Sequence, residues 1–219
     1  MVTILLATYN GEDYLKAQLE SIASQTYGNW RLVTGDDGSC DGTLGILEDF
    51  RTRYPDQVKI IKNEPATGSA RNNFINLLRN AHGPYFMFCD QDDVWKRDKI
   101  YETMKKMEAM EERYGKDTPI LVHTDLSVVD ENLEMIAESF FQYANLPKRI
   151  ALNQLIVQNS VTGCTAMINR ALQKYFLQPL PMGKILMHDY WAALVAKIFG
   201  RIGFVNEPTM YYRQHGNNS

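Results

Sequence analysis

The sequence lacks runs of basic residues, closely spaced cysteines and long apolar segments. Its 23 Lys and Arg residues stand against 26 Asp and Glu residues, and this net charge of −3 argues against a surface that binds nucleic acid through its phosphates. Cys40, Cys89 and Cys164 are far apart and have neither the spacing of a zinc site nor that of a disulfide framework, which is typical of a reducing compartment. No segment approaches the roughly 20 apolar residues of a membrane-spanning helix. We therefore expect a cytoplasmic protein without a nucleic-acid partner.

Two common nucleotide-binding signatures are also missing. No Gly-x-Gly-x-x-Gly follows the first apolar segment and no Gly-x-x-x-x-Gly-Lys-Ser/Thr occurs, so neither a dinucleotide-binding fold nor a P-loop is supported. The 219 residues, 45% of them hydrophobic, are nevertheless enough to bury a full core. One domain at 1–219 accounts for the chain.

Apolar segments alternate with amphipathic ones through the N-terminal part of the sequence. Strands are predicted at 2–7, 30–34, 58–62 and 84–89, and the segments between them carry apolar residues at the spacing of three and four that is typical of helices. This alternation predicts an α/β fold with a mostly parallel, doubly wound central sheet and helices on both faces. In such sheets, ligands bind at the carboxyl ends of the strands.

A cluster of acids follows the fourth predicted strand. Asp90, Asp92 and Asp93 lie within four positions, and carboxylates this close repel one another unless a cation or hydrogen-bond donors neutralise them. Mg²⁺ and Mn²⁺ prefer such oxygen ligands. The alternative is a solvated loop that caps a helix beginning near Lys96. Because polar turns after the first two predicted strands would lie at the same edge of the sheet, the metal site is the favoured interpretation.

Side chains of these turns can bind a nucleotide without either of the missing signatures. Tyr9 offers a ring that stacks on a base, and Asp37 can accept a hydrogen bond from N3 of a pyrimidine. Arg71, near the start of a predicted helix, can contact a diphosphate. Each residue also has an ordinary structural role, as a packed turn aromatic, a turn former and a surface helix residue. Taken singly, these residues do not decide between the two interpretations.

Four short motifs occur in an order and at a spacing that together are specific. They are Ala7-Thr-Tyr-Asn-Gly11, Asp36-Asp-Gly-Ser39 with Asp41-Gly-Thr43, Ala70-Arg-Asn72 and Asp90-Gln-Asp-Asp93. The sequence resembles the family 2 inverting glycosyltransferases of the GT-A fold, closely over about the first 100 residues and more loosely to the end. The resemblance implies a nucleotide-sugar donor, a divalent metal that bridges its diphosphate, and transfer with inversion at the anomeric carbon.

The resemblance also implies roles for individual positions. The half at 1–95 would bind the nucleotide sugar, and the half at 96–219 would hold the acceptor and the catalytic residue in a small part with a mixed sheet. The metal ligands would be Asp92 and Asp93. The residues implied to bind the nucleotide sugar are Thr8, Tyr9, Asn10, Asp37, Arg71 and Asp90.

The stretch Met187-His-Asp-Tyr-Trp191 precedes an apolar helix predicted at 192–199. Inverting transfer needs one base that takes the proton of the acceptor hydroxyl, and a carboxylate is adequate because it acts late in a loose, oxocarbenium-like transition state. Asp189 is the candidate for this base. In the related enzymes this place usually reads Glu-Asp, so His188 stands where an acidic neighbour is usual. The alternative is that Asp189 only caps the helix.

The segment that follows the acidic cluster is predicted to contain a charged helix at 96–113 and a strand at 120–124 that ends at Asp125. His123 and Asp125 would either contact a sugar hydroxyl or form a structural pair. A hairpin is predicted at 127–136, because polar turn residues interrupt its apolar pattern.

Segment 138–160 lacks a clean periodicity and is expected to be an irregular, mobile loop over the site. A strand is predicted at 163–168 behind the site. In that strand, Gly163 would permit close approach of the substrate.

The C-terminal stretch Pro208-Thr-Met-Tyr-Tyr-Arg-Gln-His-Gly-Asn-Asn218 resembles the closing segment of the family. The resemblance implies that Arg213 and His215 lie near the diphosphate and stabilise the leaving group, and a neutral His can also complete a metal shell. The Gln-x-x-Arg-Trp of processive synthases is absent, which favours addition of a single sugar. No closing helix precedes Ser219, so we expect a truncated or minimal catalytic domain whose attachment to a membrane surface would need further C-terminal residues.

The leading hypothesis is a glycosyltransferase that moves a sugar from a UDP- or dTDP-sugar to a hydroxyl of a growing bacterial surface polysaccharide or lipid-linked saccharide, at the inner face of the membrane. The form Phe88-Cys-Asp-Gln-Asp-Asp-Val-Trp95 resembles rhamnosyltransferases and points to dTDP-rhamnose. One alternative is a nucleotide-sugar-binding module without turnover. Another is a sugar nucleotidyltransferase, which would need a Gly-rich turn where Thr8-Tyr-Asn-Gly11 stands. The oligomeric state is not indicated.

Overall fold

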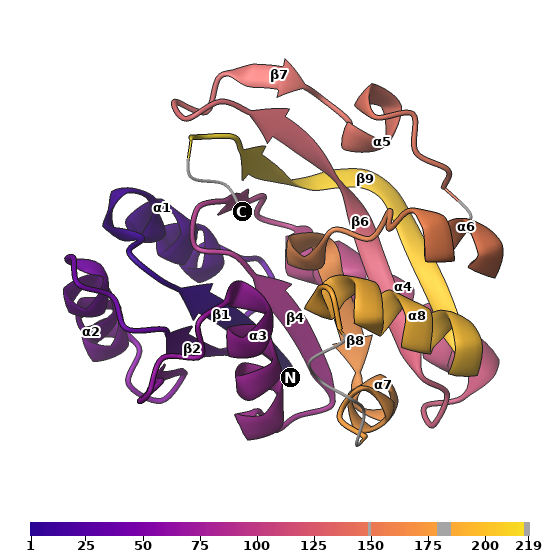
Figure 1. Cartoon of the computed structure of the whole chain (residues 1–219), viewed down its shortest axis with the longest axis horizontal. Helices are drawn as coiled ribbons and strands as arrows, with labels where there is room; N and C mark the ends of the chain where they lie inside the picture. The colour runs from indigo at the N-terminus through magenta and orange to yellow at the C-terminus, as the bar shows by residue number, and fades with distance from the viewer. Residues whose placement is uncertain (149, 179–184, 217–219) are drawn as a thin grey trace.

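A single curled sheet of nine strands runs through the computed structural model, which describes residues 1–148, 150–178 and 185–216 (Figure 1). Along the sheet the strands follow the order β3-β2-β1-β4-β8-β6-β9-β5, and β7 pairs with β6 outside this path. The fold confirms the predicted α/β architecture, a mostly parallel sheet with a mixed C-terminal part.

The N-terminal half is built by three strand-helix units and a fourth strand, as the alternation of apolar segments predicts. Strands β1 to β4 pair in parallel. Their carboxyl ends therefore meet at one edge of the sheet. The elements of this half are β1 (Val2–Thr8), α1 (Glu12–Ala23), β2 (Trp30–Asp36), α2 (Thr43–Arg53), β3 (Val58–Lys62), α3 (Ala70–Asn80) and β4 (Tyr85–Cys89).

The C-terminal half changes the strand direction and extends the sheet. Strand β8 runs antiparallel to both β4 and β6 and joins the two halves, while β6 and β9 lie parallel to each other. The elements of this half are β5 (Val94–Trp95), α4 (Lys99–Tyr114), β6 (Ile120–Val129), β7 (Met135–Ala137), α5 (Phe140–Tyr143), α6 (Leu152–Val157), a 3₁₀ turn (Gly163–Thr165), β8 (Ala166–Asn169), α7 (Arg170–Phe176), α8 (His188–Phe199) and β9 (Arg201–Arg213).

Helices cover both faces of the sheet because successive side chains of a strand point to opposite faces. On β1, Ile4 and Leu6 pack in one apolar core with residues of α1, α2 and α4. The intervening Leu5 packs in a second core with residues of α3, α7 and α8. The strands are consequently apolar on both faces, as expected of a buried parallel sheet.

The acidic cluster does not cap the helix that follows it. Residues Val94–Trp95 form the short strand β5 against β9, and the helix predicted from 96 begins at Lys99. Its N-cap residue is Asp98, whose side chain makes no capping hydrogen bond. The helix-cap interpretation of the cluster is therefore wrong.

Three predictions in the C-terminal half are corrected. Strand β6 runs on through Asp125 to Val129, because the Asp125 carboxylate accepts hydrogen bonds from inside the fold. Segment 138–160, expected to be irregular, contains helices α5 and α6. The strand predicted from Gly163 begins at Ala166, after a 3₁₀ turn.

No helix within the described ranges has the length and apolar character needed to cross a bilayer. Strand β9 carries the closing segment as far as Arg213, and His215 follows it. The predicted ending of that segment at 217–219 lies outside the described residues.

Candidate functional site

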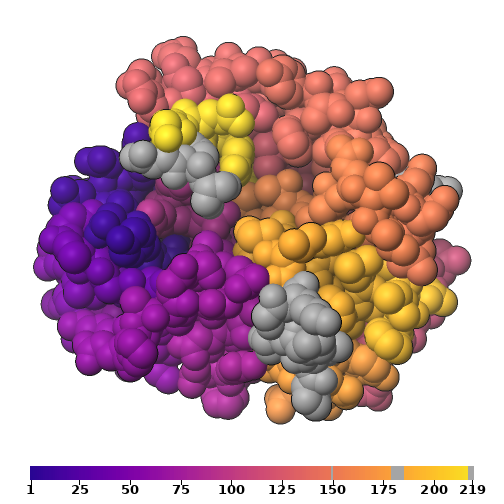
Figure 2. Space-filling view, viewed as in Figure 1, coloured from indigo at the N-terminus to yellow at the C-terminus, as the bar shows by residue number. Residues whose placement is uncertain are grey.

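A pocket of about 580 Å³ opens at the carboxyl ends of β1 and β4, against the first turn of α8. Figure 2 shows this face hollowed between the indigo and magenta N-terminal half and the orange C-terminal half. Six of the predicted site residues line the pocket: Thr8, Tyr9, Asp37, Asp90, Asp92 and Asp189. The structure thus brings together three turns and one helix start that are far apart in the sequence.

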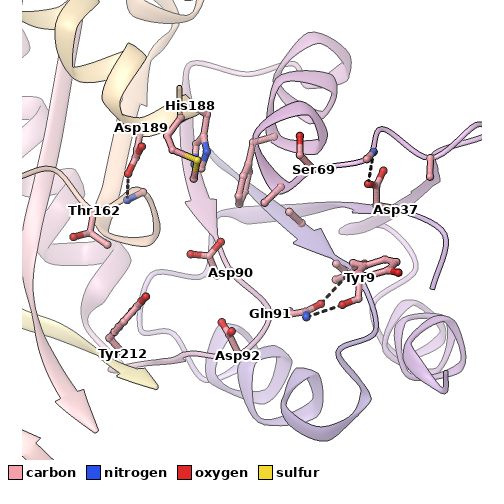
Figure 3. Close-up of a pocket in the computed structure, with 18 residues that line it drawn as sticks. Tyr9, Asp37, Ser69, Asp90, Gln91, Asp92, Thr162, His188, Asp189 and Tyr212 are labelled. Carbon is pink, nitrogen blue, oxygen red and sulfur yellow. Dashed lines mark hydrogen bonds between the residues drawn. The ribbon is translucent and has the colours of Figure 1, made fainter. Parts of the chain in front are cut away.

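Tyr9 forms one wall of the pocket, and its side chain is 58% exposed. Its backbone is fixed by Gln91, whose amide accepts a hydrogen bond from Tyr9 N and donates one to Tyr9 O, both at 2.9 Å (Figure 3). Thr8 lies beside it, and its hydroxyl donates to the Asp36 carboxylate at 3.1 Å. The backbone is held while the tyrosine ring remains open to a ligand.

Asp37 lies at the far end of the pocket and is only 7% exposed. Its carboxylate accepts hydrogen bonds from Thr67 N at 2.6 Å, Gly68 N at 2.9 Å and Asn63 Nδ2 at 3.1 Å. Burial alone would raise the pKa of Asp37, but these hydrogen bonds outweigh burial and lower it. The group is therefore an ionised, rigidly held acceptor.

The three acids of the cluster face different surroundings. Asp90 and Asp92 line the pocket, whereas Asp93 is fully buried and is not among the lining residues. Burial, followed by the charges of Asp92 and Asp189, raises the pKa of Asp90 to about 7. Ligand atoms of Asp90, Asp93 and Cys164 lie within 4.8 Å of one another. Of the predicted metal pair, Asp92 thus faces the pocket and Asp93 faces the interior.

Asp93 is fully buried beside Asp90. Its Oδ1 accepts a hydrogen bond from Arg213 N at 3.2 Å, while its Oδ2 has no partner among the described residues. Burial and the charges of Asp92 and Asp90 raise its pKa well above the usual value. Asp93 Oδ2 is thus a buried carboxylate oxygen without a hydrogen-bond partner among the described residues, and a bound cation would supply a partner.

The closing segment contacts both the acidic cluster and the pocket, because Tyr212 lines the pocket while Arg213 and His215 bind the cluster. His215 Nε2 lies 2.9 Å from Asp92 Oδ2, and Arg213 Nε donates to Asp92 O at 2.8 Å. Tyr14 contacts both, with its ring 4.6 Å from the His215 ring and 4.7 Å from the Arg213 guanidinium carbon. Neither Arg213 nor His215 lines the pocket, but both orient a residue that does.

Asp189 lies in the first turn of α8 and faces Asp90 across the pocket (Figure 3). Its Oδ2 accepts a hydrogen bond from Gly163 N at 3.1 Å, and its Oδ1 one from Tyr190 N at 2.6 Å. The N-cap residue of the helix is Met187, so Asp189 does not occupy the cap position. Burial raises the pKa of Asp189, against the opposing effect of these two hydrogen bonds. A proton acceptor held in this way is suited to act as a base.

Four further candidates lie elsewhere. Asn10 lies outside the lining of the pocket and supports a loop, accepting a hydrogen bond from Cys40 N at 2.9 Å. Arg71 is not among the lining residues, and its guanidinium donates to Ile185 O at 2.5 Å. His123 packs against Phe141 and Phe204, and the carboxylate of Asp125 accepts the Ser139 hydroxyl at 2.5 Å. His123 and Asp125 are buried outside this pocket, so their suggested contact with a sugar is not supported.

Several lining residues were not predicted from the sequence. Gln91 and Tyr212 each stand next to a predicted residue, and that adjacency was the only signal for them. Phe74 packs in the second apolar core and also forms part of the pocket wall. The remaining lining residues without a predicted site role include Ser69, Thr162 and Met187.

Comparison with known proteins identifies the family. Residues 3–176 match the family model described as glycosyl transferase family 2. The chain belongs to this family. Two of its curated relatives are the dTDP-rhamnosyl transferase RfbG of Shigella flexneri, 28% identical over 97% of this chain and 72% of its own length, and WfgD of Escherichia coli. WfgD, a UDP-Glc:alpha-D-GlcNAc-diphosphoundecaprenol beta-1,3-glucosyltransferase, is 29% identical over 87% of this chain and 67% of its own length.

Solved structures show the same GT-A fold that the resemblance to family 2 implies. S. aureus TarS 1-349 in complex with UDP-GlcNAc superposes with a TM-score of 0.74 at 22% identity, over 99% of this chain. The mannosyltransferase PcManGT from Pyrobaculum calidifontis, in complex with GDP-Man and Mn²⁺, superposes with a TM-score of 0.71 at 19% identity, also over 99%. The chain spans 59% and 57% of those two solved chains.

Proposed function

We propose that this family 2 domain transfers a sugar from a UDP- or dTDP-sugar to a saccharide hydroxyl, with inversion at the anomeric carbon. The observation that carries the proposal is the single pocket in which Asp37 and Tyr9 lie at one end and Asp189 at the other, with Asp90 and Asp92 between them. This order matches the order of parts in a nucleotide sugar, namely base, diphosphate and sugar.

The base of the nucleotide is assigned to the end formed by Tyr9 and Asp37. The exposed Tyr9 ring offers a stacking face, and an ionised Asp37 can accept the N3 hydrogen of uracil or thymine. Its three existing donors fix the carboxylate, so the added bond requires no reorganisation of the side chain. Cytosine has no N3 hydrogen, and guanine presents its ring hydrogen in another shape.

The diphosphate is assigned to the acidic middle of the pocket. Asp90 and Asp92 would hold a divalent cation, Mn²⁺ or Mg²⁺, because both carboxylates face the pocket, and the predicted ligand Asp93 would offer its unpartnered Oδ2 from the interior beside Asp90. The charge of Asp92 also contributes to the raised pKa of Asp90. When bound, such an ion neutralises the charge of the diphosphate leaving group. His215 supports the arrangement by contacting Asp92, and Arg213 places a cationic side chain against the same loop.

Asp189 is assigned as the catalytic base. The acceptor oxygen would attack the anomeric carbon as the diphosphate oxygen departs from the opposite face, and the acceptor proton would pass to a carboxylate oxygen of Asp189. Hydrogen bonds from Gly163 N and Tyr190 N orient that carboxylate. Burial raises its pKa, which makes it a stronger base than an exposed aspartate.

The acceptor and the sugar are proposed from the relatives. Similarity to RfbG supports dTDP-rhamnose as the donor, and similarity to WfgD supports a lipid-linked saccharide as the acceptor. We infer that the product of this chain is part of a bacterial surface polysaccharide that is built on the cytoplasmic side of a membrane. None of the described residues is assigned to contact with the membrane surface.

A donor screen tests the proposal directly. Thermal unfolding is recorded with Mn²⁺ and with dTDP-, UDP-, CDP- and GDP-sugars in turn, and a ligand at about 100 times its dissociation constant adds roughly 2.7 kcal/mol of stability. We expect protection by dTDP- or UDP-sugars that depends on Mn²⁺. The variant Asp92→Asn should lose that protection, while Asp56→Asn, at an exposed position far from the pocket, should keep it. Protection by none of the four donors would overturn the proposal.

A further inference from the structure

His188 is a buried polar side chain that packing alone does not explain. Its ring stacks on Phe74 with centroids 4.1 Å apart and meets the edge of Phe88 at 4.9 Å. It is 4% exposed, and neither ring nitrogen has a hydrogen-bond partner in the part of the chain that the structure describes. Figure 3 shows His188 at the start of α8, beside Asp189 on the wall of the pocket, and both ring nitrogens are covered by neighbouring residues.

The imidazole is neutral in this environment. Burial lowers the pKa of His188 to about 3, so at neutral pH the ring carries one N–H donor and one acceptor nitrogen. A buried donor or acceptor without a partner destabilises the protein, whereas a phenylalanine would fill the same space against Phe74 and Phe88 without that cost. In the protein without a ligand, the ring N–H and the acceptor nitrogen of His188 therefore make no hydrogen bond within the described residues.

The place of His188 in the pocket decides which part of a ligand it can reach. It precedes Asp189, the residue assigned to the proton of the acceptor, and lies at the opposite end of the pocket from Asp37. Gly163 lies directly against it, since a Cβ at that position would come within 2.8 Å of His188 Nε2. In the proposed arrangement, a ligand group next to His188 therefore lies near the anomeric carbon of the sugar and far from the nucleobase.

We propose that His188 recognises the transferred sugar through a hydrogen bond between one ring nitrogen and a hydroxyl of the sugar. This inference rests on the proposed function, and it makes His188 a residue that selects the donor by its sugar and not by its nucleotide. A neutral imidazole can either donate to a hydroxyl or accept from it, without adding a charge beside Asp189 and the diphosphate.

The chain offers a matched control in His123. That side chain is also buried, at 1% exposed, its pKa is also lowered to about 3 by burial, and its Nδ1 also lacks a partner among the described residues. It packs against Phe141 and Phe204 and does not line the pocket. A comparison of His188→Phe with His123→Phe separates recognition of a ligand from the general loss of a buried histidine.

The test compares the affinity for the nucleotide sugar with the affinity for the nucleotide diphosphate that lacks the sugar. By calorimetry with Mn²⁺, His188→Phe should weaken the donor about 10-fold to 100-fold, because the sugar hydroxyl loses its partner, and should leave the diphosphate unchanged. His123→Phe should change neither affinity. Donors that lack one sugar hydroxyl at a time should include one whose loss weakens binding to the wild type but not to His188→Phe.

Two outcomes would overturn the proposal. In one, His188→Phe binds the donor as tightly as the wild type; in the other, it loses donor and diphosphate equally, which would indicate a collapsed pocket. If His188→Phe does not fold, the ring nitrogens of wild-type His188 can be followed by ¹⁵N NMR, and they should shift on addition of the donor but not of the diphosphate. Equal spectra for the two ligands would refute the assignment. A wild type that binds diphosphate but no nucleotide sugar would refute the proposed function itself.

Discussion

Replacing Gly163 with alanine should displace both Asp189, the proposed catalytic base, and His188. The glycine N–H donates to Asp189 Oδ2 at 3.1 Å, and an added Cβ would lie 2.8 Å from His188 Nε2 and 3.4 Å from Asp189 Cβ. The backbone of Gly163 does not occupy the left-handed region, so alanine brings no conformational penalty and the effect is steric.

The magnitude follows from what surrounds His188. Its ring lies against Phe74 and Phe88, so it cannot move aside as the end of a flexible side chain would. Overpacking of this kind costs about 1 to 3 kcal/mol of folding stability. A displacement of Asp189 that approaches 1 Å lowers turnover by on the order of 10²-fold.

The assay measures thermal unfolding and the turnover of donor for Gly163→Ala beside Gly45→Ala. Gly45 lies in helix α2 with no atom within 4 Å of an added Cβ, so that variant should be slightly more stable, by about 0.5 to 1 kcal/mol, with unchanged turnover. Wild-type stability and turnover for Gly163→Ala would refute the contact between Gly163, His188 and Asp189.

Three further predictions concern the acids of the pocket. Asp92→Asn should weaken binding of a nucleotide diphosphate in the presence of Mn²⁺ while thermal unfolding without ligand stays within about 1 kcal/mol of wild type; unchanged calorimetric affinity would contradict the metal assignment. Competition should show UDP and dTDP binding about 10- to 150-fold more tightly than CDP and GDP, because the Asp37 acceptor stays unpaired with the latter two; equal affinities would mean that Asp37 does not contact the base. Because burial raises the pKa of Asp189 and the base must be ionised, kcat/KM should fall as pH decreases through a value above the ordinary 3.8, and an acidic limb at or below 3.8 would argue against this base.

The donor half of the fold could be predicted because its signals are local. Each strand of that half is an apolar run that ends in a polar turn, and parallel pairing brings those ends to one edge without further information. The same logic placed Tyr9, Asp37 and Asp90 on one pocket. The pairing of β8 between β4 and β6, by contrast, depends on contacts between residues more than 40 positions apart.

Other details depended on partners that the sequence does not reveal. A polar Asp125 indicated the end of a strand, yet the strand continues because Ser139 and Phe141, which come 14 and 16 positions later, supply donors to its carboxylate. Asp92 and Asp93 are equivalent as adjacent acids, but the backbone turns only Asp92 toward the pocket. The proposed role of His188 in recognising the sugar could not be predicted from the sequence, because the lack of hydrogen-bond partners for its ring is a property of the packed structure.

The most direct test of the central assignment is the rate at which nucleotide diphosphate is released from the donor by wild type and by Asp189→Asn. The protein is supplied with Mn²⁺ and the donor that protects it best, with an acceptor saccharide or with water as the acceptor. If Asp189 takes the acceptor proton, the variant should bind the donor with nearly unaltered affinity and turn it over about 10² to 10⁴ times more slowly. Wild-type turnover by Asp189→Asn would show that another group is the base and would contradict the account.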